Sequence, residues 1–405
     1  MLRPTSAGSY DPFAELPGST MTVARRSEPP RYIDPATGDT WALDVPRWRS
    51  DAGGPLLITP LRGLRRDAIA GGVRSLWRYA ATLPLAVADP VSLGEGCTPL
   101  VERRWRGIPC RCKLEWFSAT GSFKDRGASV MLSVLRQQGI RAVLEDSSGN
   151  GGAAIAGYAA AAGIKAKILV PASTQPGKTV QMRAYGAEVE LIHGTRQDTA
   201  DAAVAQAERI FYASHNWQAF FLEGVKTLAY EIWEDLGFRA PDNVVVPLGA
   251  GSIVLGCDIG FGELQRNGEI ERLPRIFGVQ PENCAPIHAA FAAGVDHAVP
   301  VEIRPTVAEG TAIAQPVRLR EVLGALRRSG GATATVGEDE ILAAFWELAA
   351  DGLYVEPTSA GVAAAFSKLV AAGTIDPGQT TVLVLSGGGL KATQRVAELL
   401  ARRGD

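Results

Sequence analysis

The sequence has few of the residues that bind metals or form disulfides. Five cysteines and four histidines occur among its 405 residues. The one close cysteine pair, Cys110 and Cys112, has a single residue between its members, which matches neither a zinc knuckle nor a redox CxxC motif. The histidines are scattered, and none lies in an HExxH-like spacing. We therefore expect no protein-bound metal, and thiols that stay reduced.

Neither sign of charge is in excess, and long apolar runs are also missing. The formal net charge is -2, so we expect no surface for nucleic acid or for an anionic membrane. The longest apolar runs, around 151–164 and 244–257, are too short and too rich in glycine and alanine to span a bilayer. No hydrophobic segment follows Arg25 and Arg26, which argues against a secretory signal. These absences favour a soluble cytoplasmic enzyme.

Beyond an expected flexible leader at residues 1–30, short β-rich runs alternate with alanine-rich helical stretches. We expect strands at 142–146, 166–170, 189–193, 243–248, 275–280 and 381–386, and helices at 152–162, 177–185, 199–210 and 223–236. This alternation predicts an α/β fold with mostly parallel sheets covered by helices. A dinucleotide-binding protein would show the same pattern, so the fold alone identifies no function.

One lysine lies at an unusual position. The segment Ser118–Gly127 begins a predicted helix, with Thr120 and Ser122 as candidate capping hydroxyls. Lys124 lies in the first turn, where the positive end of the helix dipole weakens the hold of an amine on its proton. Such an amine attacks an aldehyde more readily. The alternative is an ordinary solvated lysine beside an Asp-Arg pair.

Three further loops follow predicted strand ends, where ligands bind in open parallel sheets. Residues 147–151 read Ser-Ser-Gly-Asn-Gly and lead into a helix, so they suit a carboxylate or are simply a polar turn that caps it. Gly249–Ser252 suits a phosphate, although a tight strand-to-helix turn explains these residues equally well. The segment matches neither a Walker motif nor a complete GxGxxG motif. Ser386 offers a hydroxyl to a ring nitrogen, or is an ordinary turn serine.

Taken in this order, the four motifs resemble those of the fold type II pyridoxal-phosphate enzymes, which are tryptophan synthase β-like, and within them the threonine synthase group. Segments 91–100, 178–187 and 222–227 are also similar to that group. The resemblance implies two open, mostly parallel sheets flanked by helices, pyridoxal 5'-phosphate as cofactor, an amino-acid substrate and a homodimer. It also implies a large cofactor-binding domain of residues 31–128 and 230–405 around a small mobile domain of residues 129–229.

The same resemblance implies a role for each motif. Lys124 would hold the cofactor as a Schiff base and shuttle protons, and Phe123 would pack near the ring. Asn150 would bond the phenolic oxygen of the ring and Ser386 its nitrogen, where a hydroxyl favours elimination and replacement over transamination. The phosphate of the cofactor would be held by Leu248, Gly249, Ala250, Gly251 and Ser252. The substrate would be bound by Ser147, Ser148, Gly149, Asn150 and Gly151.

One departure from the group concerns the far end of the substrate. Threonine synthases usually carry an arginine before their Leu-Glu-Gly element to bind the phosphate of the substrate, whereas this chain has Phe221. A ring makes no bidentate contact with phosphate, and an aromatic wall would suit a less charged side chain. Lys178, Arg183 or Lys226 could compensate.

The resemblance thus implies a threonine-synthase-like lyase that performs β,γ-elimination and replacement on O-phosphohomoserine or a related amino acid, giving threonine and phosphate. One alternative keeps the cofactor but performs β-elimination or β-replacement, as in a threonine or serine dehydratase or a cysteate-synthase-like enzyme. The segment Thr306–Gly310, which resembles dehydratase relatives, favours that alternative. Two more distant alternatives are a catalytically idle binding protein and a nucleotide-binding oxidoreductase.

Overall fold

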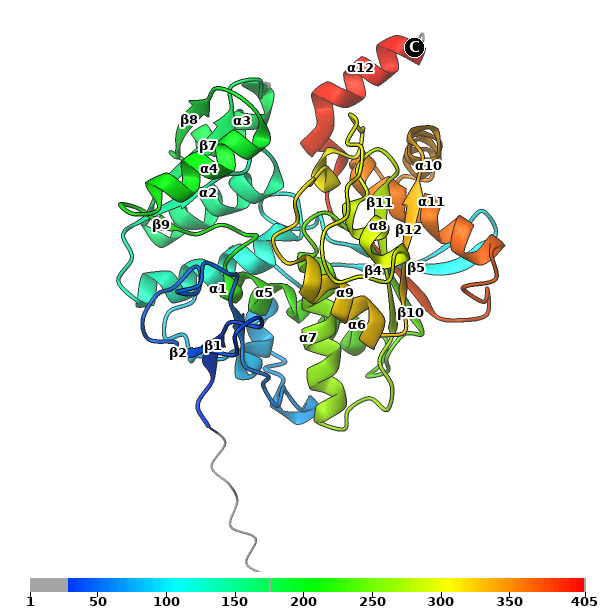
Figure 1. Ribbon diagram of the computed structural model, residues 1–405. Helices are drawn as coiled ribbons and strands as arrows, with labels where there is room; N and C mark the ends of the chain where they lie inside the picture. Colours follow the sequence, from blue (N-terminus) through cyan, green and yellow to red (C-terminus); the bar gives the residue numbers. More distant parts are fainter. Residues whose placement is uncertain (1–27, 175, 404–405) are drawn as a thin grey trace, which may run out of the picture.

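The structure, a computed structural model, describes residues 28–174 and 176–403. The predicted leader at 1–30 therefore lies almost entirely outside the described residues. Within them the chain forms the expected α/β fold, with two mainly parallel sheets and helices packed around them (Figure 1). A small antiparallel sheet of β1 (Arg31–Ile33), β2 (Thr40–Ala42) and β3 (Leu57–Ile58) precedes them and was not predicted.

The larger sheet has six strands in the order β12-β11-β10-β13-β5-β4, and only β4 runs antiparallel to its neighbour. Every residue of the central strands β10 and β13 is buried, which explains why both consist mainly of β-branched and aliphatic residues. The strands are β4 (Leu100–Trp105), β5 (Ile108–Leu114), β10 (Asn243–Pro247), β11 (Arg275–Pro281), β12 (Ala332–Val336) and β13 (Thr381–Leu385).

The smaller sheet has four parallel strands in the order β8-β7-β6-β9. They are β6 (Ala142–Glu145), β7 (Lys165–Pro171), β8 (Glu188–Ile192) and β9 (Phe211–Tyr212). Helices α2 (Asn150–Ala162), α3 (Pro176–Ala184) and α4 (Arg196–Gln206) connect them. All six predicted strands are confirmed to within about two residues at each end, which is the usual uncertainty of such boundaries.

Helices α1 (Lys124–Gln137) and α5 (Ala219–Val225) lie between the two sheets and share one hydrophobic core with α2, α6 (Thr227–Asp235) and α7 (Ser252–Arg266) (Figure 1). A second core lies on the opposite face of the six-stranded sheet, under α10 (Glu338–Ala350) and α11 (Pro357–Ala371). The other helices are α8 (Pro286–Ala292), α9 (Leu319–Arg328), α12 (Thr393–Arg403) and the short 3-10 turns η1 (Arg66–Ala68), η2 (Leu76–Thr82), η3 (Glu309–Thr311) and η4 (Gly389–Ala392).

The prediction of one helix at 223–236 is wrong, because α5 ends and α6 begins at Lys226. The side chain of Lys226 is fully buried and forms ion pairs with Glu223 at 2.5 Å and Glu263 at 2.8 Å. Its ammonium also donates to the carbonyl of Thr82 at 2.8 Å. Burial by itself would lower the pKa of this lysine, but the two carboxylates outweigh that effect and raise it.

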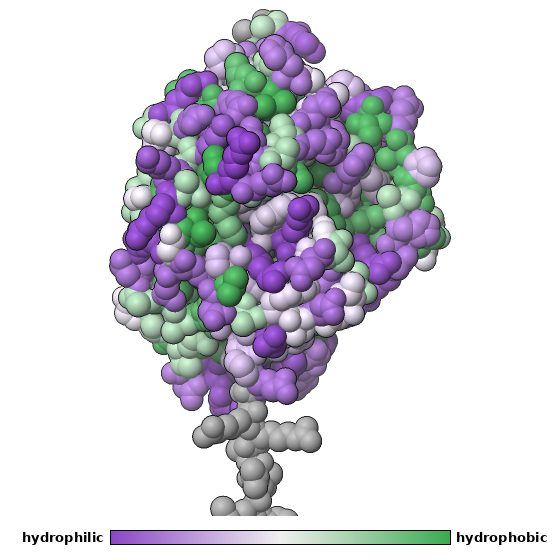
Figure 2. Space-filling view, turned by 60° about the vertical axis from the view of Figure 1, so that its left-hand side comes forward, coloured by the Kyte–Doolittle hydropathy of each residue, from purple (hydrophilic) through white to green (hydrophobic). Residues whose placement is uncertain are grey.

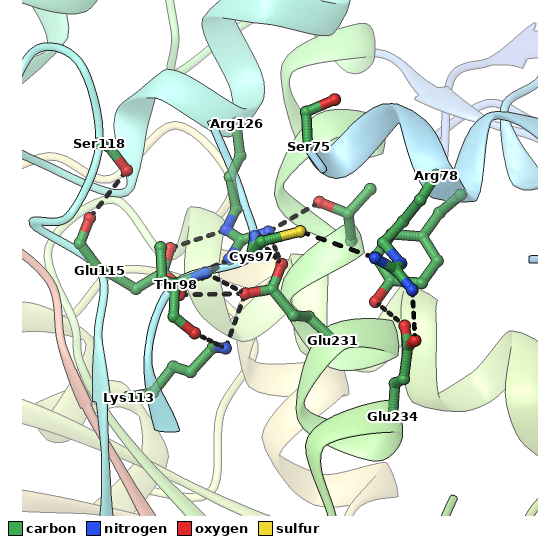
Figure 3. Close-up of polar contacts among 12 residues, drawn as sticks. Ser75, Arg78, Cys97, Thr98, Lys113, Glu115, Ser118, Arg126, Glu231 and Glu234 are labelled. Atoms are coloured by element: carbon green, nitrogen blue, oxygen red, sulfur yellow. Dashed lines mark hydrogen bonds and ion pairs between the residues drawn. The ribbon is translucent and has the colours of Figure 1, made fainter. Parts of the chain in front are cut away.

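A second buried network joins α1 to the six-stranded sheet (Figure 3). Arg126 contacts Glu115 at 2.7 Å and Glu231 at 3.0 Å, and none of the three side chains is more than 3% exposed. Lys113 pairs with Glu231 and with Asp235, each at 2.7 Å. Because every charge in this network faces an opposite one, the network tolerates burial that would be costly for a single ion.

The outer surface shown in Figure 2 carries hydrophilic side chains over much of its area, with smaller hydrophobic areas between them. Among the described helices, none has the length and the apolar character that crossing a bilayer requires.

Replacing Lys226 by methionine should lower the free energy of unfolding by about 3–5 kcal/mol, because it leaves two carboxylates buried without their cation. The matched control is Lys368→Met, since Lys368 is 42% exposed and pairs with Glu340 at 2.9 Å. That change should cost less than about 1 kcal/mol. Urea unfolding followed by circular dichroism measures both, and equal effects of the two substitutions would contradict the assignment of a buried ion pair.

Candidate active site

A cavity of about 400 Å³ lies between loops that follow strands of the two parallel sheets. The structure brings almost all of the predicted site residues to its surface. Its lining includes Phe123, Lys124, Ser147, Ser148, Gly149, Asn150, Gly151, Gly249, Ala250, Gly251, Ser252 and Ser386. Leu248 does not line it: this side chain is fully buried and points toward Gly278 of β11, so only its backbone remains near the loop.

Lys124 is the first residue of α1 and projects into the cavity, where its ammonium lies 4.5 Å from the centre of the Phe123 ring. Removal from bulk water lowers the pKa of Lys124 from 10.5 to about 8, although the nearby carboxylates of Glu145 and Glu356 act in the opposite direction. At neutral pH a usable fraction of this amine is therefore unprotonated, as a nucleophile requires.

The loop before α1 is built differently from the sequence prediction. Neither Thr120 nor Ser122 caps the helix: the backbone amide of Thr120 donates to the Asp125 carboxylate at 2.8 Å, and its hydroxyl binds the same carboxylate. The hydroxyl of Ser122 is buried and has no hydrogen-bond partner among the described residues. The predicted caps are wrong because Asp125, inside the first turn, folds back and satisfies the loop itself.

Backbone contacts join this loop to the loop after β13, and so place Ser386 beside Lys124. The amide of Phe123 donates to the carbonyl of Ser386 at 2.9 Å, and Ser122 forms a β-bridge with Gly387. Two motifs more than 260 residues apart in the sequence are thereby held as one surface.

Glu356 is a site residue that the sequence reasoning missed. Its carboxylate is buried in the cavity lining and accepts hydrogen bonds from Asn150 Nδ2 at 3.0 Å and Ser386 Oγ at 3.4 Å. Burial raises the pKa of Glu356, while these donors and the cations of Lys391 and Lys124 lower it. The only sequence signal was the following Pro357, which marks the start of a helix and not a site.

The glycine-rich loop Gly249–Ser252 connects β10 to the start of α7. Gly251 has a φ of +94°, and a Cβ there would come within 2.2 Å of Val322. At Gly249 a Cβ would lie 3.0 Å from the carbonyl oxygen of Gly310. A helix start with no capping side chain leaves its first amides free for an anion, and the missing side chains let that anion approach.

These groups fit pyridoxal 5'-phosphate, because each of its polar parts finds a matching group around one cavity. Lys124 offers an amine of lowered pKa for the aldehyde, and the start of α7 offers amides for the phosphate. Asn150 and Ser386, which both point at Glu356, offer an amide and a hydroxyl for the polar edges of the ring.

Phe221 does not form the cavity wall that the sequence suggested. It is fully buried, and a Cβ on Gly127 would come within 2.5 Å of its ring, so the ring fills the gap over that glycine. Lys226 lies in the core and Arg183 lies on the surface outside the cavity lining, so neither can compensate for a missing arginine. Of the three suggested cations, only Lys178 lines the cavity, paired with Glu309.

Three more cations line the cavity, and the sequence reasoning did not identify them. Arg196 pairs with Asp146 at 2.8 Å, Lys391 donates to Gln181, and Arg395 pairs with Glu398 at 3.0 Å. His215 also lines it, although the sequence showed it only as one of four scattered histidines. No sequence signal marked these residues, because each reaches the cavity through tertiary packing.

Comparison with known proteins gives the same assignment. A threonine synthase of Methanosarcina acetivorans is 36% identical over 80% of this chain and 82% of its own length. One of Methanocaldococcus jannaschii is 35% identical over 78% of this chain and 80% of its own length. The solved structure of a threonine deaminase from T.th. is 28% identical and covers 72% of this chain and 92% of its own, with a TM-score of 0.61.

The family model described as pyridoxal-phosphate dependent enzyme matches residues 91–387, which include Lys124, Asn150, Gly249–Ser252 and Ser386. This chain therefore belongs to the pyridoxal-phosphate dependent enzymes of fold type II.

Proposed function

We propose that the protein is a threonine-synthase-type lyase that converts O-phosphohomoserine and water into threonine and phosphate. The observation that carries this proposal is the single cavity that combines Lys124, the loop 147–151 and the glycine-rich loop in a chain whose threonine synthase relatives are 36% and 35% identical. Sequence similarity alone does not show that these loops lie together. Because they line one cavity, a single substrate can contact all of them.

In this proposal Lys124, Phe123, Asn150, Ser386 and the loop from Leu248 to Ser252 hold the cofactor. Bound pyridoxal phosphate withdraws electrons from the substrate and thereby weakens its Cα–H bond. Lys124 then removes the Cα proton and helps to remove a proton from Cβ. The loop Ser147–Gly151 orients the carboxylate of the substrate, because amides at the start of α2 favour an anion.

The cations Lys178 and Arg196 supply the positive charge for the phosphate of the substrate, in place of the arginine that Phe221 replaces. Both line the cavity, and both come from the part of the chain around the smaller sheet. Glu309 and Asp146 form ion pairs with these two cations. A lysine has three N–H donors and an arginine five, so each cation keeps donors for the phosphate of the substrate. This arrangement gives an anionic leaving group a local site, although the net charge of the protein is only -2.

One observation favours a second candidate, a hydroxy-amino-acid dehydratase. Glu309 and Gly310, part of the segment that resembles dehydratase relatives, line the cavity. A dehydratase would release a 2-oxo acid from threonine or serine, and would neither need nor release phosphate.

We further propose that residues 129–229 move as a unit against residues 31–128 and 230–405 when the substrate binds. The pairs Lys178–Glu309 and Asn150–Glu356 connect these two parts across the cavity.

We also propose a cytoplasmic homodimer. All five cysteines are free, which fits a reducing compartment. Light scattering of the cofactor-loaded protein would contradict the dimer if it returned the mass of one chain.

The purified, cofactor-loaded protein should release phosphate and threonine from O-phosphohomoserine in equal amounts, because each turnover produces one of each. Lys124→Ala should lower the rate at least about 100-fold, since it removes the proton-transferring amine. The matched control is Lys165→Ala, an exposed lysine on β7, which should leave the rate unchanged. A 2-oxo acid formed from threonine or serine, with no phosphate release, would instead support the dehydratase.

Attachment of the cofactor to the apoprotein should become faster as the pH rises and should level off above about 8, the pKa to which burial lowers Lys124. Only the unprotonated amine reacts, so the rate follows its fraction. Borohydride trapping followed by mass spectrometry of the Lys124 peptide measures it. Nα-acetyl-lysine serves as the reference, and a protein rate that kept rising in parallel with it would show that the pKa is not lowered.

Hydrogen exchange at residues 145–152 should slow when O-phosphohomoserine is added, because domain closure would bury this loop against the substrate. Exchange on the antiparallel pair β4–β5 should not change, since both strands lie in the larger sheet. Unchanged protection of both segments, with the substrate demonstrably bound, would contradict the proposed movement.

A further inference from the structure

A buried histidine at the cavity is not used by the mechanism above. His215 follows β9 and precedes α5, is only 7% exposed, and lines the cavity. Its ring lies edge-on to Phe221, with the two centres 5.8 Å apart, and the Lys124 ammonium lies at the same distance from the Phe221 ring. Phe221 therefore packs beside both the catalytic lysine and this imidazole.

Glu145, at the end of β6, holds the imidazole in one orientation. Its carboxylate is fully buried, accepts the backbone amide of His215 at 3.0 Å, and lies 3.0 Å from Nδ1 of the same residue. Burial by itself would raise the pKa of Glu145, but the contacts with His215 outweigh it and the pKa is lowered. An ionised carboxylate here requires the proton on Nδ1, which leaves Nε2 as the basic nitrogen.

The backbone of Gly151 packs against the Nδ1 and Cε1 atoms of the ring. A Cβ on Gly151 would lie 2.6 Å from both Cε1 and Nδ1 of His215, so only glycine fits where the loop crosses the ring. No hydrogen bond to Nε2 is present among the described residues. Glu145, Phe221 and Gly151 thus fix the ring. His215 lines the cavity, and its Nε2 is free to bond a molecule bound there.

The charge state of His215 suits a base. Burial lowers its pKa and the nearby Lys124 ammonium lowers it further, while Glu145 and Asp146 oppose these effects. The imidazole is therefore neutral near pH 7, with a free lone pair. The carboxylates of Glu309 and Glu356 also line the cavity, but Lys178 holds the first and Asn150 and Ser386 hold the second.

The proposed reaction has one proton transfer more than Lys124 alone accounts for. The Cα proton leaves and returns, and the proton lost from Cβ is added to Cγ after the Cγ–O bond to phosphate has broken. A water molecule then forms the new C–O bond at Cβ and must lose a proton. That proton balances the one that the departing phosphate gains on its freed oxygen, so no other reactant is needed.

We propose that His215, positioned by Glu145, is the base that takes this proton from the attacking water. The inference rests on the proposed threonine synthase activity and adds a catalytic residue to it. As the oxygen of the water bonds to Cβ, Nε2 accepts the proton and afterwards passes it to the released phosphate. Glu145 acts only through His215 and is a positioning residue, since its carboxylate keeps Nδ1 protonated.

The test compares His215→Gln with His288→Gln. His288 is the matched control because it is also partly buried and hydrogen-bonded, to Thr333 at 2.9 Å, but does not line the cavity. Phosphate, threonine and 2-oxobutanoate are measured from O-phosphohomoserine. Exchange of the Cα proton of 2-aminobutyrate in heavy water is measured separately, since it needs Lys124 but no water addition.

In His215→Gln, Cα exchange should stay within about 3-fold of the wild type, whereas threonine formation should fall about 100-fold, the size of a lost general base. Because elimination precedes water addition, phosphate release should persist and 2-oxobutanoate should replace threonine. Glu145→Gln should shift the product ratio in the same direction. His288→Gln should keep wild-type exchange and equal amounts of threonine and phosphate.

A merely structural role would give a different pattern. If the rates of Cα-proton exchange, phosphate release and threonine formation in His215→Gln all fell by the same factor, His215 would not be the base. The same conclusion would follow if this variant still formed threonine and phosphate in equal amounts. If the wild type exchanged the Cα proton of 2-aminobutyrate but released no phosphate from O-phosphohomoserine, the proposed function itself would fail, and the assignment of His215 with it.

Discussion

The buried ion-pair network around Arg126 is the constraint on which the geometry of the site depends. Arg126 lies two residues after Lys124, and its guanidinium is held by Glu115, directly after β5, and by Glu231 of α6. A charged side chain without exposure cannot shift without leaving a carboxylate unpaired, which is far more costly than breaking a surface pair. The network shown in Figure 3 therefore fixes Arg126, and with it the first turn of α1, against the six-stranded sheet. Lys124 begins this turn and is placed with it.

Because the backbones of α1 and α5 lie very close together, the position of α1 also determines the position of α5 beside the cavity. A Cβ on Gly224 of α5 would lie 2.1 Å from the carbonyl oxygen of Arg126, so α5 can pack on α1 only with glycine there. Gly127 gives the matching space on α1, which the ring of Phe221 fills. The segment before α5 carries His215, so the packing that positions Phe221 also positions the imidazole. The aromatic residue that replaces an expected arginine is thus a packing residue that does not line the cavity.

The sequence predicted the parts of this protein that depend on local patterns. Strand runs, the lysine at a helix start and the glycine-rich loop are each readable within about ten residues, and the shared cavity follows once their strands lie in parallel sheets. The errors all involve partners far along the chain or contacts that only the folded loop reveals. The sequence offers Thr120 as a helix cap, but in the structure Thr120 donates to Asp125. The sequence offers Lys226 as a cation for the substrate, but this lysine is buried in an ion pair with Glu263. Glu356 and His215 join the site through tertiary contacts that no local pattern contains.

The charges around Lys124 also explain how one small cavity can lower the pKa values of two basic residues. Burial lowers the pKa of both Lys124 and His215, and the Lys124 ammonium lowers the pKa of His215 further. Glu145 opposes these effects for both residues, but it bonds only His215, so it fixes the tautomer of one base and merely moderates the other. A carboxylate bonded to Lys124 instead would hold that amine protonated and inactive. Because Glu145 bonds the imidazole and not Lys124, Nε2 of His215 keeps its lone pair while the pKa of Lys124 stays lowered, at about 8.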